Sequence, residues 1–300
     1  MVGSDRSAPG PGAWVLAARP KTLSAAAAPV VVGAGLGVFH GTGRLLPVLA
    51  ALVGALLIQI GTNLANDYFD FMKGTDTEDR LGPVRVTQAG LIPPATVRRG
   101  MIVTLGLAFL VGVYLVWVGG LPIVVVGLAS LVCAVAYTGG PYPLAYNGLG
   151  DLFVFVFFGL VAVGGTYWVQ ALALPPDVLL AGVAMGALST AILVVNNLRD
   201  LETDARAGKR TLAVMLGRAG TQGEYLVMAG VAATVPVVGV LGFGWPLPSL
   251  AALLGLVPLL TPLRTVFSFE DPRQLNPALG QTARSVAVYG LLLAGGLALG

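Results

Sequence analysis

Long apolar stretches separated by short polar segments run through almost the whole of this 300-residue chain. Residues 100–150 contain no charged side chain, which leaves room for two membrane-crossing helices of about 20 residues each. Applied to the other apolar stretches, the same length rule predicts nine transmembrane helices. Their ranges are 20–40, 45–68, 97–118, 121–138, 148–171, 177–198, 218–243, 246–267 and 281–300.

The amino-acid composition supports a membrane-embedded fold. The chain is 56% hydrophobic and 10% charged, whereas a soluble domain is about 45–50% apolar and about 25% charged. Its mean hydropathy is +0.86. We therefore expect an all-α membrane protein, a bundle of nine transmembrane helices that forms one domain over residues 19–300. Residues 1–18 lack the apolar stretch of a signal peptide and are expected to be a flexible tail.

The basic residues are distributed unevenly along the chain. Every Lys and Arg except Arg44 lies in the N-terminal segment or in the segments that follow the second, sixth and eighth predicted helices. Such an imbalance marks the cytoplasmic side of a membrane protein. We expect a multi-pass protein of the cell (inner) membrane, with its N-terminus and its acidic loops in the cytoplasm. Its expected surroundings are the lipid bilayer, and no nucleic acid partner is expected.

Acidic residues gather in two similar segments, 63–80 and 196–211. The first reads NLANDYFDFMKGTDTEDR and the second reads NNLRDLETDARAGKRT. Each follows directly on an apolar stretch, and both contain Asn-x-x-x-Asp, at 63–67 and at 196–200. The repeat indicates two similar halves that share one polar site.

Four of these acids, Asp67, Asp70, Asp200 and Asp204, lie within about one turn of an apolar helix, where ionisable groups are costly and mark functional sites. Side chains three or four residues apart share a helix face, and two carboxylates on one face repel each other unless a cation lies between them. Oxygen ligands suit Mg²⁺, which typically takes one or two carboxylates plus substrate phosphates. The two segments therefore predict a site for Mg²⁺ and a diphosphate.

Basic and amide side chains beside the acids extend this prediction, because charged nitrogen donors bind phosphate oxygens strongly. The candidate substrate ligands are Asn63, Asn66, Arg80, Arg85, Asn196, Lys209 and Arg210. The simpler interpretation of acids at a helix end is a solvated cytoplasmic rim. We favour that interpretation for Glu78, Asp79 and Glu202.

Four stretches in chain order resemble one family of membrane enzymes. They are ARPKTLSAAAAPVVVG, NLANDYFDFMKGTDTEDRLGPVRVTQAGLI, YTGGPYPLAYNGLGDLFVFVFFGLVAVGGTYWVQ and NNLRDLETDARAGKRTLAVMLG. The chain resembles the UbiA superfamily of intramembrane prenyltransferases over nearly its whole length. Within that superfamily it resembles the 1,4-dihydroxy-2-naphthoate polyprenyltransferases of the MenA type. Nine transmembrane helices are also the architecture of that superfamily.

The resemblance implies specific site residues. The pattern Asn-x-x-x-Asp-x-x-x-Asp fits at Asn196, Asp200 and Asp204, but the first motif has Gly74 in its third position and Asp76 two residues later. The implied metal ligands are Asp67, Asp70, Asp76, Asp200 and Asp204. The implied catalytic and substrate residues also include Lys21, Arg85, Tyr137, Asp151 and Lys209. For Asp151 a helix N-cap is the alternative role.

The resemblance also implies a reaction, the transfer of a polyprenyl group from polyprenyl diphosphate to 1,4-dihydroxy-2-naphthoate with loss of CO₂, giving a demethylmenaquinone. Mg²⁺ is the implied cofactor and Mn²⁺ a possible substitute. One alternative is a related enzyme with another acceptor, such as 4-hydroxybenzoate, homogentisate or a chlorophyllide. A more distant alternative is a secondary transporter, which can also combine repeats with intramembrane acids.

Overall fold

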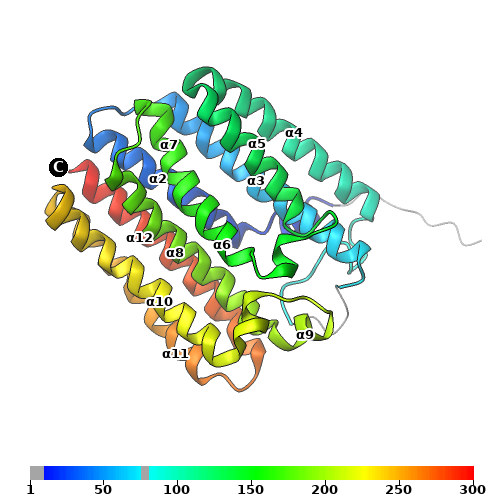
Figure 1. Ribbon diagram of the computed structural model, residues 1–300. Coiled ribbons are helices and arrows are strands. Elements are labelled where there is room, and N and C mark those ends of the chain that lie inside the picture. Colours follow the sequence, from blue (N-terminus) through cyan, green and yellow to red (C-terminus); the bar gives the residue numbers. More distant parts are fainter. Residues whose placement is uncertain (1–9, 76–80) are drawn as a thin grey trace, which may run out of the picture.

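The computed structural model describes residues 10–75 and 81–300, and over these residues the chain is a helical bundle with no strand (Figure 1). Nine long helical segments make up the bundle within the described part of the chain. They are α2 (Pro20–Phe39), α3 (Leu45–Met72), α4 (Pro94–Gly119), α5 (Leu121–Ala136), α6 to α7 (Gly150–Ala171), α8 (Pro176–Arg199), α10 (Leu212–Phe243), η3 with α11 (Leu247–Ser268) and α12 (Leu275–Ala298). The all-α membrane architecture expected from the sequence is confirmed.

Seven of these nine segments, counted over residues 10–75 and 81–300, are long and apolar enough to cross a membrane. The other two are α5, an apolar helix of 16 residues, and α12, which contains Gln281 and Arg284. Shorter elements connect the long ones. They are α1 (Pro11–Ala18), η1 (Leu144–Asn147), α9 (Leu201–Arg206) and η4 (Pro272–Gln274).

The helices extend further into polar sequence than the apolar stretches indicate. Helix α3 continues to Met72, four residues beyond its apolar stretch, so that it carries most of the first acidic segment. Helix α10 begins at Leu212 and passes Gly217, whose φ of 69° interrupts regular helical geometry. Polar residues at helix ends have low hydropathy but ordinary helical backbone geometry, so a hydropathy rule places the ends too early.

Residues 11–18, which we expected to belong to a flexible tail, form helix α1. Ala17 is buried in a small apolar cluster that Trp14 joins. The Trp14 ring lies so close to α4 that a Cβ added at Gly100 would be 2.8 Å from it. One tryptophan and a few alanines thus anchor a segment too short to stand out in a hydropathy pattern.

Helix α8 is the centre of the larger hydrophobic core, to which α2, α7, α10, α11 and α12 also contribute. Small residues allow the close packing, because a Cβ at Gly186 of α8 would lie 2.5 Å from the carbonyl oxygen of Phe155. The first and last long helices also meet, since Gly35 of α2 touches Ala294 of α12. The chain therefore closes on itself around α8.

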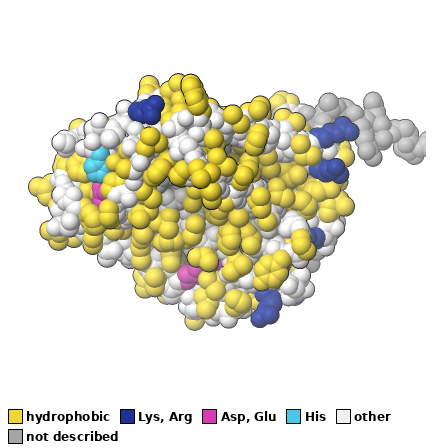
Figure 2. Space-filling view, turned by 45° about the horizontal axis from the view of Figure 1, so that its top comes forward, with side chains coloured by type: hydrophobic (Ala, Val, Ile, Leu, Met, Phe, Trp, Pro, Cys, Tyr) yellow, Lys and Arg dark blue, Asp and Glu magenta, His cyan; other side chains and the backbone are white. Residues whose placement is uncertain are grey.

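Helices α3, α4 and α5 form the opposite side of the bundle (Figure 1). In the most apolar 18-residue stretch of α4 only 11% of residues are buried, against 78% in α8. Hydrophobic side chains cover most of the face in Figure 2, whereas most of the basic side chains on that face gather toward one end. The broad apolar surface is what a lipid-facing wall requires.

Candidate active site

A cavity of about 1000 Å³ opens between the wall helices α3, α4 and α5 and the helices from α6 to α8. Polar and apolar side chains line different parts of it. Toward one end it is polar, with Asn63, Asn66, Asp70, Arg85, Asn196, Asp200, Asp204 and Lys209. Elsewhere it is lined by apolar side chains and glycines, among them Val113, Gly112, Leu128, Phe157, Val161 and Gly165. One compartment can therefore receive a molecule that is charged at one end and apolar along its length.

The last turns of α3 bring the first acidic segment to this cavity. Asn63, Asn66 and Asp70 share one helix face, at spacings of three and four residues, and all three line the cavity. Asp67 lies at the edge of this face, about 60° around the helix from Asp70. Its carboxylate accepts the backbone N–H of Val86 at 3.3 Å and lies outside the described cavity lining.

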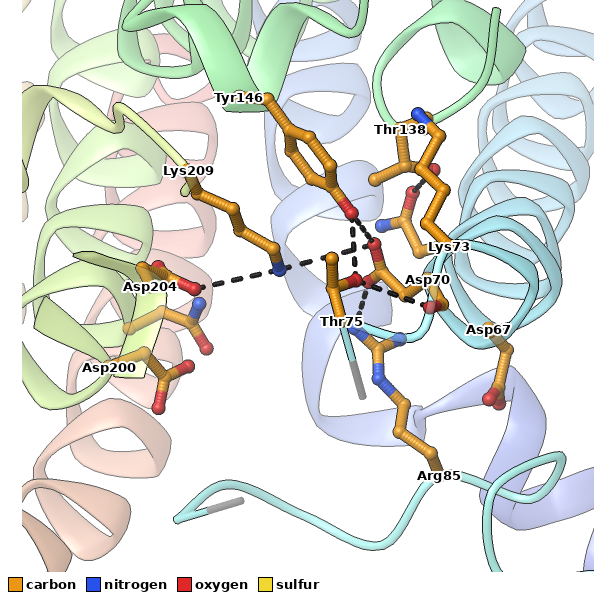
Figure 3. A network of polar contacts seen from close by, with 12 residues as sticks. Asp67, Asp70, Lys73, Thr75, Arg85, Thr138, Tyr146, Asp200, Asp204 and Lys209 are labelled. Atoms are coloured by element: carbon orange, nitrogen blue, oxygen red, sulfur yellow. Dashed lines mark hydrogen bonds and ion pairs between the residues drawn. The ribbon is translucent and has the colours of Figure 1, made fainter. Parts of the chain in front are cut away.

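Asp70 is the meeting point of the polar end (Figure 3). Its Oδ2 accepts a hydrogen bond from the Arg85 guanidinium at 3.0 Å. Its Oδ1 accepts the phenolic hydrogen of Tyr146 and lies 4.0 Å from the Lys209 ammonium. A buried carboxylate held by two basic side chains and a hydroxyl has a fixed orientation.

Tyr146 lies between two lysines (Figure 3). The Lys73 and Lys209 ammonium groups are each 4.8 Å from the centre of its ring, within the range of cation–π attraction. Lys73 also donates to the carbonyl oxygen of Thr138 at 2.6 Å, and burial lowers its pKa. The aromatic ring therefore lies between two like charges.

The second acidic segment is positioned where α8 ends. Arg199 is the last residue of α8, Asp200 caps it, and Asp204 lies on the short helix α9. The N–H of Asp204 donates to the carbonyl oxygen of Asp200 at 2.7 Å, so the two acids remain one turn apart. Burial raises the pKa of Asp204 to about 6, against the opposing effect of Lys209, whose Nζ is 3.5 Å from Asp204 Oδ1.

Lys209 thus connects the two acidic segments. Its Nζ lies within 4.0 Å of Asp70 in the first segment and of Asp204 in the second. Since these acids are 134 positions apart along the chain, the helix packing brings the two halves of the repeat to one place. The shared polar site expected from the repeat is a feature of the structure.

The remaining residues predicted for the site differ in where they lie. Lys21 is exposed and borders a small groove between α2 and α12. Arg210 is also exposed, and its backbone N–H donates to Tyr146 O at 2.9 Å. Tyr137 lines the cavity, whereas Asp151 is buried in the first turn of α6 outside the cavity lining, and Leu149 holds the N-cap position of that helix. Asp76 and Arg80, with Glu78 and Asp79, lie outside the described residues.

Sequence reasoning missed three contributors, Lys73, Tyr146 and Arg199. Lys73 and Arg199 were interpreted only as part of the charge imbalance, although each directly adjoins an Asp-rich helix end. An arginine beside an apolar helix is costly unless it is paired, which is the signal that marks Arg199. Tyr146 lies in a turn-rich stretch and offers no comparable pattern.

The donor atoms of the site fit a hard divalent cation. Among residues 10–75 and 81–300, no three His, Cys, Asp or Glu side chains are close enough to hold one ion by themselves. Each acidic segment instead presents one or two carboxylates and two asparagines to the cavity. Mg²⁺ is typically bound in this way, by one or two carboxylates with substrate phosphates and water completing its coordination.

Two named relatives are similar to this chain over nearly its whole length. The relative from Mycobacterium tuberculosis named 1,4-dihydroxy-2-naphthoate octaprenyltransferase is 42% identical over 290 residues, covering 96% of this chain and 97% of that relative. The relative of the same name from Escherichia coli is 37% identical over 298 residues, covering 96% and 95%.

Solved structures share the fold at low sequence identity. An apo UbiA homologue from Aeropyrum pernix superposes with a TM-score of 0.69 at 13% identity, covering 90% of this chain and 96% of that one. A UbiA homologue from Archaeoglobus fulgidus, bound to DMAPP and Mg²⁺, gives a TM-score of 0.65 at 14% identity, covering 93% and 98%. Residues 26–278 match the profile described as the UbiA prenyltransferase family, and the chain belongs to that family.

Proposed function

We propose that this protein transfers a polyprenyl group from polyprenyl diphosphate to 1,4-dihydroxy-2-naphthoate. The ring carbon that bears the carboxylate forms a bond to C1 of the prenyl chain, the allylic C–O bond breaks, and diphosphate leaves. CO₂ is then lost from the same ring carbon, which restores the aromatic 1,4-diol and gives a demethylmenaquinol, the two-electron reduced form of a demethylmenaquinone. The names of the two relatives at 42% and 37% identity support this choice of acceptor.

One observation carries the proposal, namely the division of the cavity into a charged end and an apolar remainder. A polyprenyl diphosphate has the same division. Its diphosphate would meet Arg85 and Lys209, while its isoprenoid chain would lie along the apolar lining. The apolar part would also exclude water, which prevents hydrolysis of a reactive allylic centre.

The residues of the site would have three separate roles: binding metal, binding diphosphate and positioning a carboxylate. Asp70, Asp200 and Asp204 would hold Mg²⁺, with Mn²⁺ as a possible substitute, and bound metal supplies the Lewis acidity that stabilises a departing diphosphate. Arg85 and Lys209 would bind the diphosphate oxygens by charge-assisted hydrogen bonds. Tyr146 would keep the Asp70 carboxylate turned toward the cavity. Fixed charges of this kind stabilise the leaving group without reorganisation.

The polar end would face the cytoplasm. Arg85, Arg199 and Lys209 belong to the basic segments, whereas Arg44 lies in the loop between α2 and α3, away from these segments. Under the positive-inside rule, this distribution supports a diphosphate site at the cytoplasmic side of the cell membrane. Soluble diphosphate could then leave directly into the cytoplasm.

The direct test uses purified protein with a radiolabelled polyprenyl diphosphate and a panel of aromatic acids. We expect 1,4-dihydroxy-2-naphthoate to be prenylated with one CO₂ released per coupling, and 4-hydroxybenzoate to be used poorly or not at all. Preferential use of 4-hydroxybenzoate with its carboxylate retained would reject the naphthoate assignment. Transfer to none of these acids would reject the proposed reaction.

Metal removal is a second test. Turnover should stop in EDTA and return when Mg²⁺ is added back, because paired carboxylates and a diphosphate cannot approach each other without a cation. Turnover that persists in EDTA, with trace metal excluded by chelating resin, would contradict the proposed role of the two acidic segments.

A further inference from the structure

Arg199 is almost completely buried, at 1% exposure. It forms a fork on Asp200, with Nε donating to Oδ1 at 2.8 Å and NH2 donating to Oδ2 at 2.6 Å. NH2 also donates to Oδ1 of Asn196 at 2.8 Å, and NH1 donates to Oδ1 of Asn276 at 3.0 Å. One guanidinium therefore holds an acid and two amides at once.

Such an arrangement needs a reason, because a buried ion pair is weak evidence for stability and apolar residues of similar volume often serve as well. Two of the groups that Arg199 holds, Asn196 and Asp200, line the cavity. We propose that Arg199 is a positioning residue that sets the direction of the Asp200 carboxylate and the Asn196 amide toward the metal-diphosphate site. This inference rests on the proposed function.

The geometry leaves Asp200 able to bind a metal while Arg199 holds it. A carboxylate has about four lone-pair positions, of which the fork occupies two. The planar guanidinium fixes the plane of the carboxylate, which a lysine ammonium cannot reproduce. Partners of this kind, which orient a metal ligand without touching the metal, typically contribute about 10- to 100-fold to metal affinity.

Arg199 also connects the second acidic segment to the first. Asn276 of α12 accepts from Arg199 and donates through Nδ2 to the carbonyl oxygen of Leu81 at 2.9 Å. Gly82 follows, so close to Arg199 that an added Cβ would lie 2.7 Å from NH2. Three residues later Arg85 binds Asp70.

This path runs from Asp200 to Asp70 through Arg199, Asn276 and the segment 81–85. It joins the two halves of the repeat independently of Lys209. Arg199 therefore also positions the first acidic segment. Moving its guanidinium would move both the Asp200 carboxylate and the segment that carries Arg85.

The test measures metal binding without turnover. Protein in detergent is titrated with Mn²⁺ in the presence of a non-reactive prenyl diphosphate analogue, and free Mn²⁺ is followed by electron paramagnetic resonance. We expect Arg199→Lys to raise the half-saturating Mn²⁺ concentration about 10- to 100-fold. Gly82→Ala should raise it in the same direction by displacing the guanidinium while keeping Arg199.

Two matched controls accompany these variants. Arg218→Lys removes an arginine that donates to Phe269 O, far from the cavity lining, and Gly230→Ala adds a methyl group where nothing lies within 4 Å. Both controls should bind Mn²⁺ like the wild-type protein. If Arg199→Lys does not fold, Gly82→Ala alone decides the matter.

The outcomes separate the two proposals. Wild-type affinity in Arg199→Lys and Gly82→Ala, each with normal folding, would overturn the positioning role and leave the proposed function intact. Weakened binding in the controls to the same extent would also overturn it. A wild-type protein that binds no Mn²⁺ with the diphosphate analogue would remove the proposed function, and this inference with it.

Discussion

The two sides of the bundle are built differently although each carries one copy of the same acidic pattern. Helix α8 packs against α2, α7, α10 and α12 and borders the cavity only along its second half, whereas α4 and α5 expose one side and border the cavity on the other. The second pattern thus lies at the end of a rigid scaffold, and the first lies at the end of a wall. Two similar acidic patterns in the sequence can therefore lie on helices that are packed to very different extents.

The partners of the two acidic segments reflect this difference. Asp200 is held by the planar fork of its direct neighbour Arg199. Asp70 is held by Arg85, Tyr146 and Lys209, which come from three other segments of the chain. The scaffold side is locally fixed, whereas the wall side depends on long side chains that converge from elsewhere.

The largest expected loss of activity comes from replacing one acid on either side of the bundle. Asp70→Asn and Asp200→Asn should each lower kcat by more than about 100-fold, because even the outer partners of metal ligands contribute about 10- to 100-fold. Steady-state kinetics with the prenyl diphosphate measures this. Glu202→Gln is the matched control, since Glu202 is exposed beside the same segment. A large loss on one side alone would show that only one acidic segment takes part.

The next prediction concerns packing rather than chemistry. Gly186→Ala should lower the stability of the scaffold by about 1–3 kcal/mol, because the new methyl group meets the backbone of Phe155 at 2.5 Å. Gly112→Ala on α4 has no atom within 4 Å of its new methyl group and should leave the thermal midpoint near that of the wild type. Thermal unfolding in detergent compares the two. Equal midpoints would mean that the scaffold is less tightly packed than described.

A bulkier change at the same wall position should alter substrate choice instead of stability. Gly112 lines the apolar part of the cavity, so Gly112→Leu would occupy space intended for the isoprenoid chain. We expect kcat/KM for a long polyprenyl diphosphate to fall about tenfold relative to that for a short one, the equivalent of about 1.4 kcal/mol. An unchanged ratio would place the chain along another part of the cavity.

The smallest expected effect comes from Tyr146→Phe. The ring between Lys73 and Lys209 remains, while the hydroxyl loses its contact with Thr75 and its hydrogen bond to Asp70, the bond that holds a carboxylate of the site. A single hydrogen bond contributes about 0.5–1.5 kcal/mol, so kcat should fall about 2- to 10-fold. A loss as large as that of Asp70→Asn would mean that the wall side depends on one hydroxyl, contrary to the shared support described above.

Much of this architecture could be predicted from the sequence because membrane spans have a strong signal. The nine apolar stretches correspond to the nine long segments, with errors confined to their polar ends, as at Met72 and Leu212. The short α1 was missed because its anchors, Trp14 and Ala17, depend on a tertiary contact. Its contribution appears only once α3 and α4 are in place.

Part of the site could also be predicted, because helical spacing is visible in the sequence. Helical spacing brings Asn66 and Asp70 to one face, and that spacing is visible in the sequence. Spacing alone cannot say which face meets the cavity, so the different direction of Asp67 became clear only from the structure. Tyr146 was missed because its role comes from lying between Lys73 and Lys209, which are 136 positions apart along the chain.

The contact between α2 and α12 has a consequence for how the protein is made. Chains grow from the N-terminus, so α12, which closes the ring against Gly35, leaves the ribosome after the helices from α2 to α11. It also carries Asn276, the link between Arg199 and Leu81. A chain that has grown only as far as α11 therefore already holds both acidic segments but lacks Asn276 and the helix that closes the ring.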